Sequence, residues 1–426
     1  MPVVPGACRA SPVLSAEPAG ANVRRLAVKD RPLDALTQTS AVSAEEYLDR
    51  IRSILGPIRT ASAEIEAGRQ LPGHIVQLMR DAGVFEVAVP RSWGGPEFDP
   101  ITQARGIELL STADGSAGWC AMIGCDTGYV SAFLDDAVGR ELFKDPAQAS
   151  VFVLSPGGVA VPVDGGYTVT GNWSFASGST HAKVYALGCL AKTDAGPRMV
   201  NENTPEIRVV VLPSEQAEVI DTWTTTGVRG SGSHDVSVTG VFVPEARTFA
   251  MFERAKRPGP LYALPNLFTA KMGAVPLGIA RGAIDDILAM AATKRSLGTS
   301  VPIAEQPWLQ TAVAVAETKL GQARAFYYEA LGDVWAQLVD SGRASLTSRA
   351  RLHLSYAGAI DRALEIVDAM YRAGGSSSLY ARGTLDRRLR DIHTIAQHVV
   401  SSPQTVADSG KVLLGLPVPN ALLLRD

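Results

Sequence analysis

Residues 165–182 read GGYTVTGNWSFASGSTHA and indicate the fold more clearly than any other part of the chain. Large apolar side chains recur on alternate positions at Tyr167, Val169, Trp173 and Phe175, which predicts a strand. We expect the strand to end at Ser177-Gly178. A glycine lets the backbone approach a planar ligand, and a serine hydroxyl beside it can donate to a ring nitrogen or carbonyl. This combination suits a flavin, and a core strand followed by a turn is the alternative that the residues leave open.

A second stretch, residues 225–244, reads TTGVRGSGSHDVSVTGVFVP and places a Gly- and Ser-rich turn before another strand. The order of the two stretches resembles the middle β-domain of the acyl-CoA dehydrogenase superfamily. The patterns WSFASG and GVRGSGSHDV resemble its oxygenase branch, the group D reduced-flavin-dependent two-component monooxygenases, more than the fatty-acid dehydrogenases.

The order of helical and strand periodicities predicts an α+β protein with four segments. We expect a flexible N-terminal tail (1–42), an N-terminal α-helical domain (43–150), a middle β-domain (151–255) and a C-terminal helical bundle (256–426). Long helices with Ala and Leu on one stripe indicate that the last segment is an antiparallel four-helix bundle. The same order is what the resemblance to the acyl-CoA dehydrogenase superfamily implies.

Composition sets limits on partners and compartment. The chain has 426 residues, 46% hydrophobic and 19% charged, with a net charge of -3, which gives no electrostatic case for nucleic acid or an anionic membrane. The first forty residues lack an apolar run of signal-peptide or membrane-spanning length. The cysteines show no CxxC spacing, so we expect buried thiols of a reducing, cytoplasmic compartment. They are Cys8, Cys120, Cys125 and Cys189.

Several common catalytic signatures are missing from the sequence. No GxGxxG follows a strand, and no Walker A loop, HExxH or GxSxG is present. His393 and His398 lie five residues apart, which on a helix turns them about 140° from each other. We therefore predict no metal site, and the nicotinamide-dependent, nucleotide-hydrolysing, zinc-protease and serine-hydrolase classes lack their motifs.

Residues 387–404, RRLRDIHTIAQHVVSSPQ, are predicted to form the last long helix and to carry a catalytic residue. In the resembling dehydrogenases a catalytic glutamate stands eight positions after an Arg-Asp pair. Counting from Asp391 reaches Val399, which cannot accept a proton. His398 stands immediately before it and, with an ordinary pKa of about 6.5, suits a general base. A buried structural histidine is the alternative reading, and Glu365 on another helix is the alternative base.

The resemblance assigns roles to further residues. Phe175 would flank the isoalloxazine ring, and the hydroxyl of Ser177 would approach N5. Trp173 would either shield the ring or fill the core. The remaining cofactor-binding residues that we predict are Gly178, Arg229 and Ser231, with Ser233 on the same rim. The predicted substrate contacts are Trp119, Cys125, Asp126 and His393.

Basic residues near the ends of the bundle helices bear on the choice of flavin. The cluster Arg382, Arg387, Arg388 and Arg390 is most simply a solvated helix face with internal ion pairs. A site for a flavin phosphate that comes from a neighbouring subunit is the alternative. An arginine that holds the FAD pyrophosphate across a dimer in the resembling dehydrogenases is replaced here by Lys294, with Arg295 next to it. This replacement weakens the case for FAD and leaves FMN open.

The resemblance implies a flavin-dependent monooxygenase (hydroxylase) that uses FMNH2 or FADH2 and O2. Reduced flavin would come by diffusion from a separate NAD(P)H:flavin reductase, and a C4a-(hydro)peroxyflavin would oxygenate a small aromatic or natural-product substrate. Ser177 would bond to the flavin, and His398 would take a phenolic or amine proton. A homotetramer is also implied. The alternatives are an FAD-dependent acyl-CoA dehydrogenase and a catalytically inactive binding protein of the same fold.

Overall fold

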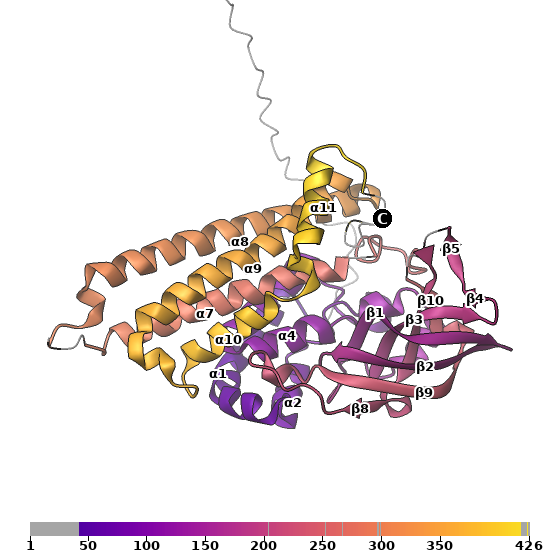
Figure 1. Cartoon of the computed structure of the whole chain (residues 1–426), viewed down its shortest axis with the longest axis horizontal. Coiled ribbons are helices and arrows are strands. Elements are labelled where there is room, and N and C mark those ends of the chain that lie inside the picture. The colour runs from indigo at the N-terminus through magenta and orange to yellow at the C-terminus, as the bar shows by residue number, and fades with distance from the viewer. Residues whose placement is uncertain are drawn as a thin grey trace, which may run out of the picture. The chain divides into compact units, whose positions relative to one another are not determined.

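The structure is a computed structural model that describes residues 42–418 and residue 424, apart from 203, 252, 266, 296, 297 and 299 (Figure 1). Of the predicted N-terminal tail, all but Val42 lies outside the described residues, as does Cys8. The helical and strand segments follow the predicted order of an α-helical region, a β-sheet and a helical bundle.

Side-chain caps fix where the N-terminal helices begin. The helices are α1 (Ala44–Gly68), α2 (Gly73–Asp81), α3 (Pro100–Ala113), α4 (Gly115–Gly124), α5 (Thr127–Ser131) and α6 (Asp136–Leu142). Ser43 caps α1, because its hydroxyl accepts the N–H of Glu46 at 3.1 Å. Asp114 separates α3 from α4, and its carboxylate accepts the N–H groups of Ser116 at 2.9 Å and Ala117 at 3.0 Å.

The middle segment forms a large sheet with strand order β10-β7-β3-β1-β2-β9-β8. The strands are β1 (Ser150–Val163), β2 (Gly166–Ala176), β3 (Val184–Thr193), β4 (Gly196–Pro197), β5 (Met199–Asn201), β6 (Thr204–Pro205), β7 (Ile207–Pro213), β8 (Glu218–Ile220), β9 (His234–Pro244) and β10 (Thr248–Ala250). Strands β2 and β9 are antiparallel neighbours that pair Trp173 with Val236 and Ala176 with His234. The two stretches that indicated the fold therefore lie side by side.

The sequence Pro156-Gly157-Gly158 is typical of a turn, but these residues continue β1 through an irregularity in its pairing with β3. The indole of Trp173 packs onto the two glycines. A Cβ atom on Gly157 would lie 2.8 Å from this ring, and one on Gly158 would lie 2.3 Å from it. The glycines serve close packing of a large side chain here, and the chain does not reverse.

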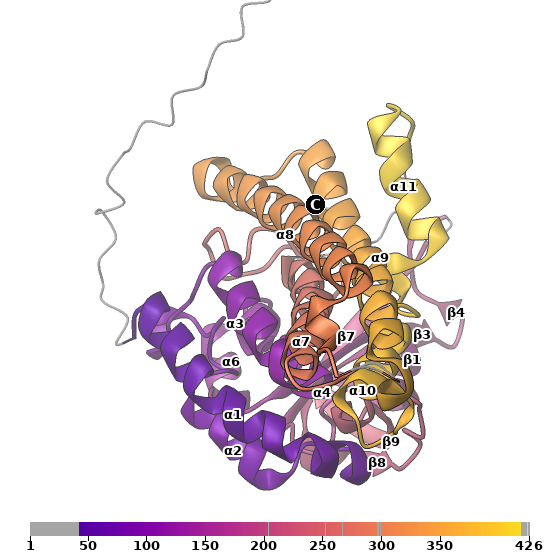
Figure 2. The ribbon, with the colours of Figure 1, turned by 90° about the vertical axis from the view of Figure 1, so that its left-hand side faces the viewer.

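The C-terminal helices pack against one another as a bundle. After the short η5 (Leu267–Gly273) come α7 (Ala274–Ala291), α8 (Pro307–Ser341), α9 (Leu346–Gly374), α10 (Thr384–Ile395) and α11 (Pro403–Leu413). Helix α9 contacts α7, α8, α10 and α11. Figure 1 shows α7, α8 and α9 running along one another, and the turned view in Figure 2 shows α10 beside α9.

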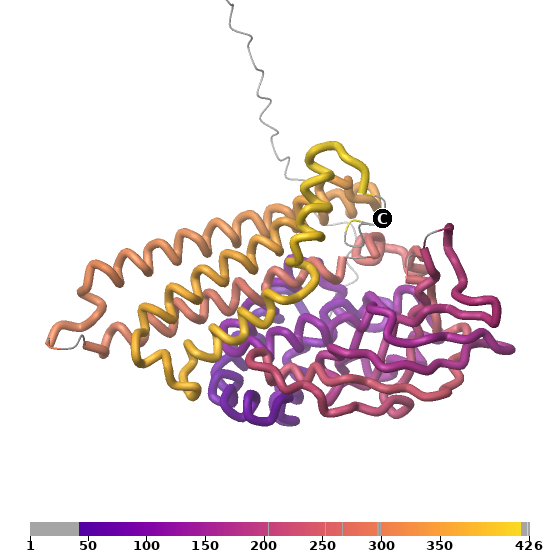
Figure 3. Tube along the Cα trace, in the orientation of Figure 1, coloured from indigo at the N-terminus to yellow at the C-terminus, as the bar shows by residue number. Residues whose placement is uncertain are grey.

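The predicted long helix does not continue through His398. Helix α10 ends at Ile395, and His398 has an extended backbone (φ -68°, ψ 144°) before the short η8 (Val399–Ser401). Ser402 then caps α11, and Pro403 begins it. A proline at the first position starts a new helix and disfavours a continuous one. The tube in Figure 3 shows this break in the path of the chain.

Among the described residues, no helix combines the length and the apolar character that crossing a membrane requires. The largest apolar cluster spans the N-terminal helices, the sheet and the bundle. Helix α4 contacts both β1 and α7. It thus lies where the helical segments meet the sheet.

Candidate functional site

Helix α4 has the sequence GSAGWCAMIG and is buried on every side, with only Ile123 partly exposed. Its small residues allow neighbours to approach closely. A Cβ atom on Gly118 would lie 1.9 Å from the hydroxyl of Ser111 on α3, and one on Gly124 would lie 2.8 Å from the ring of Phe85. Close packing is therefore a sufficient reason for this composition. The larger side chains of α4, above all Trp119, reach the site.

Trp119 joins the helical segment to the first β-motif. Its indole N–H donates to the hydroxyl of Ser177 at 3.0 Å, and both side chains are buried. The hydroxyl of Ser177 lies 2.6 Å from that of Ser233, which in turn lies 2.7 Å from that of Ser231. Both predicted motifs and the predicted Trp119 thus meet in one buried row of hydroxyl groups.

His398 reaches the same place from the bundle. Its ring packs edge-on against Trp119, with 5.7 Å between ring centroids and 65° between ring planes. The extended backbone at His398 brings about this approach. Burial lowers the pKa of His398 to about 4, so the ring is neutral at pH 7 and is a weaker base than an ordinary histidine. The backbone N–H of Val400 donates to its Nδ1 at 3.3 Å.

Phe175, two residues before Ser177, exposes its aromatic ring at the surface. Its φ of 64° is unusual for a residue with a side chain, and 72% of the residue is exposed. Its ring meets that of Trp223 edge-on, with 6.2 Å between centroids. Trp223 is held in turn, because its backbone N–H donates to Nδ1 of His234 at 3.2 Å. A strained backbone that exposes a large apolar ring is typical of a ligand site.

Trp173 is not exposed in this way, and the prediction that it lies on the same strand face as Phe175 is wrong. The pairing of β2 with β9 shifts register between Trp173 and Ala176, which reverses the alternation of faces. Trp173 is 1% exposed, and its indole N–H donates to the carbonyl of Gly188. Of the two roles that the sequence left open, the structure favours core filling.

Gly178 and Arg229 hold the turns that carry the hydroxyls. Gly178 has a φ of 79°, and its N–H donates to the carbonyl of Ser231 at 2.8 Å. The guanidinium of Arg229 donates to the carbonyls of Thr225 at 2.9 Å and Glu66 at 3.3 Å. These groups join the second motif to the first and to α1.

Cys125 and Asp126 lie beyond the other end of α4 and contact a residue that the sequence interpretation missed. Lys271 is 0% exposed, and its Nζ lies 2.5 Å from the carboxylate of Asp126 and 3.0 Å from the sulfur of Cys125. Its ammonium also lies 4.8 Å from the centroid of Tyr129. Burial raises the pKa of Asp126 to about 6 although Lys271 lowers it. Burial acts to lower the pKa of Lys271, but Asp126 and Cys125 raise it on balance.

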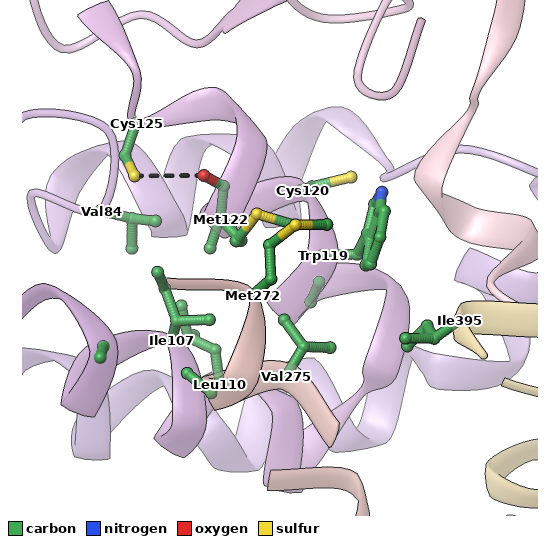
Figure 4. Packing of buried hydrophobic residues seen from close by; sticks show 14 of the residues in the cluster. Val84, Ile107, Leu110, Trp119, Cys120, Met122, Cys125, Met272, Val275 and Ile395 are labelled. Carbon is green, nitrogen blue, oxygen red and sulfur yellow. Dashed lines mark hydrogen bonds between the residues drawn. The ribbon is translucent and has the colours of Figure 1, made fainter. Parts of the chain in front are cut away.

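Figure 4 shows Cys125 and Trp119 on opposite sides of a group of apolar side chains. Met122 and Met272 lie between Trp119 and Cys125 in that view, above Val275. These flexible, apolar side chains form a wall that extends from Trp119 toward Cys125. The structure therefore brings Trp119 to the site with Ser177 and His398, and it surrounds Cys125 and Asp126 with other partners.

His393 and Glu365 lie on surface ion pairs. His393 is half-exposed on α10 and lies 3.0 Å from the carboxylate of Asp368. Glu365, the alternative base, pairs with Lys319 at 2.7 Å and Arg362 at 2.8 Å. Neither residue shares a contact with Trp119, Ser177 or His398 among the described interactions. The expectation that the two histidines do not share a site is met, although α10 ends before the second one.

The arginine cluster is not a solvated helix face. Arg388 is buried and pairs with Asp286 on α7 at 2.6 Å. Arg387 pairs with Glu66 on α1 at 2.8 Å, and Arg390 pairs both with the same Glu66 and, at 2.8 Å, with Asp386 of its own helix. The remaining basic residues also have partners within the chain. Lys294 donates to the carbonyl of Gly374 and the hydroxyl of Ser377, and Arg295 donates to the carbonyl of Ser300. The guanidinium of Arg382 lies over the ring of Tyr380.

Asp391 holds the second motif onto α10. Its carboxylate accepts the backbone N–H of Val228 at 2.6 Å. Burial, with the nearby Asp114, raises the pKa of Asp391 to about 7. The Arg390-Asp391 pair is the signal in the sequence that points to this residue.

The signals for the other missed residues were present. Lys271 is the only charged residue between Arg257 and Arg281, and Asp126 is the only one between Asp114 and Asp135. Lone opposite charges in two uncharged stretches predict a buried pair. Within the described parts of the chain, no three His, Cys, Asp or Glu side chains are grouped as a metal site requires. Two surface hollows share Arg257 and Pro258 and include no residue of the hydroxyl row.

Family models match the two helical regions of the chain. The N-terminal domain of acyl-CoA dehydrogenases matches residues 46–141, and their C-terminal domain matches residues 270–403. These matches flank the sheet that carries both motifs.

Curated relatives and solved structures extend the similarity to nearly the whole chain. The indole-3-acetate monooxygenase of Pseudomonas putida is 30% identical over 402 residues, 93% of this chain and 99% of that protein. The flavin-dependent monooxygenase oxygenase subunit HsaA of Rhodococcus jostii is 26% identical over 390 residues, 88% of this chain and 100% of that protein. The crystal structure of the HsaA monooxygenase from M. tuberculosis matches with a TM-score of 0.82 at 26% identity, covering 89% of this chain and 100% of that one.

Proposed function

The chain belongs to the acyl-CoA dehydrogenase family and, within it, to the flavin-dependent monooxygenases, and from this premise we propose that its site oxygenates a small aromatic substrate with reduced flavin and O2. One observation carries the proposal. The buried hydroxyl of Ser177 and the neutral imidazole of His398 both contact Trp119, and the exposed ring of Phe175 stands two residues before Ser177 in the chain. An exposed aromatic ring, a hydroxyl and a proton acceptor are the groups that such a reaction needs.

The site fits an isoalloxazine ring. Phe175 and Trp223 offer an aromatic surface to a planar ligand, and the hydroxyl of Ser177 offers a hydrogen bond at its polar edge. Reduced flavin, when bound, supplies the electrons that activate O2 for transfer of one oxygen atom. FMNH2 and FADH2 are both candidates, because the flavin ring is common to them.

His398 is the residue that we propose to accept the substrate's proton. Its low pKa leaves it neutral at pH 7. A base this weak takes a phenol or amine proton only as oxygen transfer makes that proton more acidic. The acceptor atom would be Nε2, so Nδ1 must carry the ring hydrogen. Nδ1 then no longer accepts the hydrogen bond from the N–H of Val400. That contact is 3.3 Å long, and giving it up leaves the N–H of the buried Val400 without this acceptor.

Water exclusion is the role that we propose for the wall of α4 and the bundle. Met122, Met272, Val275 and Ile395 turn apolar side chains toward one another beside Trp119 (Figure 4). A dry site limits the loss of activated oxygen to solvent. Methionine side chains adapt to ligands of different shape, which suits a pocket that takes an aromatic molecule.

The similar proteins suggest the substrate class and the partners. Two relatives are named indole-3-acetate monooxygenases, so we propose an aromatic substrate for this chain. Oxygenase subunits of this kind take reduced flavin from a reductase, and we propose that flavin reaches this chain by diffusion. A homotetramer and a cytoplasmic location complete the proposal. The free thiols of Cys120, Cys125 and Cys189 are consistent with a reducing compartment.

Reconstitution with a purified NADH:flavin reductase tests the proposal. We expect oxygenated product from a panel of phenols and indoles, with NADH consumed only when the reductase is present. Reduction of protein-bound oxidised FAD by an acyl-CoA without O2 would support the dehydrogenase alternative. Failure to bind either flavin in either redox state would favour a catalytically inactive binding protein.

A further inference from the structure

Three buried hydroxyl groups form a continuous row that ends on a carbonyl. Oγ of Ser177 lies 2.6 Å from Oγ of Ser233, which lies 2.7 Å from Oγ of Ser231. The hydroxyl of Ser231 donates to the carbonyl of Val228 at 2.7 Å. The three serines are at most 6% exposed. We call Ser177, Ser233 and Ser231 the hydroxyl chain.

The available hydrogens fix the direction of the hydroxyl chain. Each hydroxyl has one hydrogen to donate, whereas a carbonyl can only accept and an indole N–H can only donate. Ser231 gives its hydrogen to Val228, so Ser233 must donate to Ser231, and Ser177 must donate to Ser233. The indole of Trp119 donates into Ser177 at the other end. Without a ligand, the hydrogen of Ser177 therefore points into the protein.

A ligand acceptor beside Ser177 requires the opposite direction. If Ser177 donates outward, Ser233 can turn its hydrogen to Ser177, and Ser231 can turn its hydrogen to Ser233. Both contacts between hydroxyls survive this rotation, and no proton leaves its oxygen. Only the bond from Ser231 to Val228 is lost. The carbonyl of Val228 keeps a second donor, the indole N–H of Trp223 at 3.0 Å.

We propose that the hydroxyl chain is a reversible donor, in which Ser233 and Ser231 are positioning residues that turn Ser177 outward when an acceptor arrives. This inference rests on the proposed function, since the acceptor is a ring nitrogen or carbonyl of flavin at Ser177. Trp223 links the two halves of the site, because it supports Phe175 by ring contact and remains a donor to the carbonyl of Val228 when Ser231 turns away.

The test is a double-mutant cycle on flavin affinity, measured by anaerobic titration with FMNH2 and FADH2. Ser231→Ala removes the hydrogen bond from Ser231 to the carbonyl of Val228, which must be broken before Ser177 can donate outward. We expect flavin to bind about two- to tenfold tighter, because the wild type breaks one neutral hydrogen bond when flavin binds and the variant does not. The same substitution should have no effect in a Ser177→Ala or Ser233→Ala background. Ser177 and Ser231 contact each other only through Ser233, so their coupling identifies the chain.

Ser179→Ala is the matched control. Ser179 is a buried serine of the same turn that donates to the carbonyl of Gly232 at 3.0 Å and has no bond to the hydroxyl chain. Its effect on affinity should be the same with or without Ser177. The reversible donor would be overturned if Ser231→Ala weakened flavin binding in every background, or if the effects of the Ser177 and Ser231 substitutions were additive. Flavin binding by the wild type would still support the proposed function in that case. If the wild type binds no flavin, both proposals fall together.

Discussion

The two ends of α4 carry buried polar groups of opposite kind. At one end, the neutral hydroxyl chain meets Trp119, and its hydrogen bonds can run in either direction. At the other end, the charged pair of Lys271 and Asp126 is 0% and 3% exposed at its side chains, and Cys125 also contacts the lysine. A row of neutral hydroxyl groups can exchange one hydrogen-bond partner for another, whereas loss of one member of a buried ion pair strongly destabilises the folded protein. The difference separates a site that can respond to a ligand from one that holds helices together.

Removing one charge of the ion pair should give the largest effect. Lys271→Met leaves the carboxylate of Asp126 buried without its partner, which should destabilise the protein by about 3–5 kcal/mol. The midpoint of urea unfolding measures this loss. Ser231→Ala, at the neutral end, should cost about 1 kcal/mol in the same assay.

A double variant sharpens this prediction. Lys271→Met combined with Asp126→Leu removes both charges, so most of the stability should return. A single variant as stable as the wild type would show that the pair holds nothing together. A double variant as unstable as the single one would show that shape, and not charge, matters at this end of α4.

His398→Ala should give the next largest effect, at the hydroxyl-chain end. Loss of the proton acceptor should lower product formation about 100-fold, while flavin affinity changes by less than about twofold. Oxygen consumption should then exceed product formation, measured by an oxygen electrode and product analysis. His393→Ala is the control, because His393 is half-exposed and pairs with Asp368. Equal coupling in the wild type and His398→Ala would remove His398 from the mechanism.

The pH dependence of stability should show a smaller effect of the same residue. The pKa of His398 is about 4 in the folded protein, whereas a histidine in the unfolded chain binds its proton near pH 6.5. Between these values the unfolded state binds more protons, so stability is lost as the pH falls from about 6.5 toward about 4. The loss should be on the order of 1 kcal/mol between about pH 7 and pH 5. Unfolding of His398→Gln should lack this component, and an identical acid response in both proteins would contradict the buried neutral ring.

The sequence was sufficient to predict the order of helical and strand segments, because long amphipathic periodicities and caps such as Ser43 and Asp114 are local signals. It was insufficient where a local departure decides the geometry. Helical periodicity runs on past Ile395, whereas the backbone at His398 is extended before α11 begins at Pro403. The expected alternation of inward- and outward-facing side chains along β2 also fails at Phe175, because the positive φ there reverses which residues face inward.

The candidate site was predictable in part. Ser177, Trp119, His398 and Ser231 come from four separate stretches of the chain, and family motifs pointed to each one. Their contacts depend on the pairing of β2 with β9 and on the extended backbone at His398, which no periodicity encodes. Lys271 carries no motif, and the signal for it was its position as a lone charge in an uncharged stretch. That signal predicts burial with an opposite charge, whereas the identity and distance of the partner Asp126 come from the tertiary structure.

The central claim is that the site binds reduced flavin and controls its reaction with O2. The most direct measurement mixes the protein anaerobically with FMNH2 or FADH2 and then adds O2 in a stopped-flow spectrometer. We predict that bound flavin returns to its oxidised absorbance more slowly than free flavin, and that one flavin is preferred. Oxidation at the rate of free flavin, with both cofactors, would contradict the account.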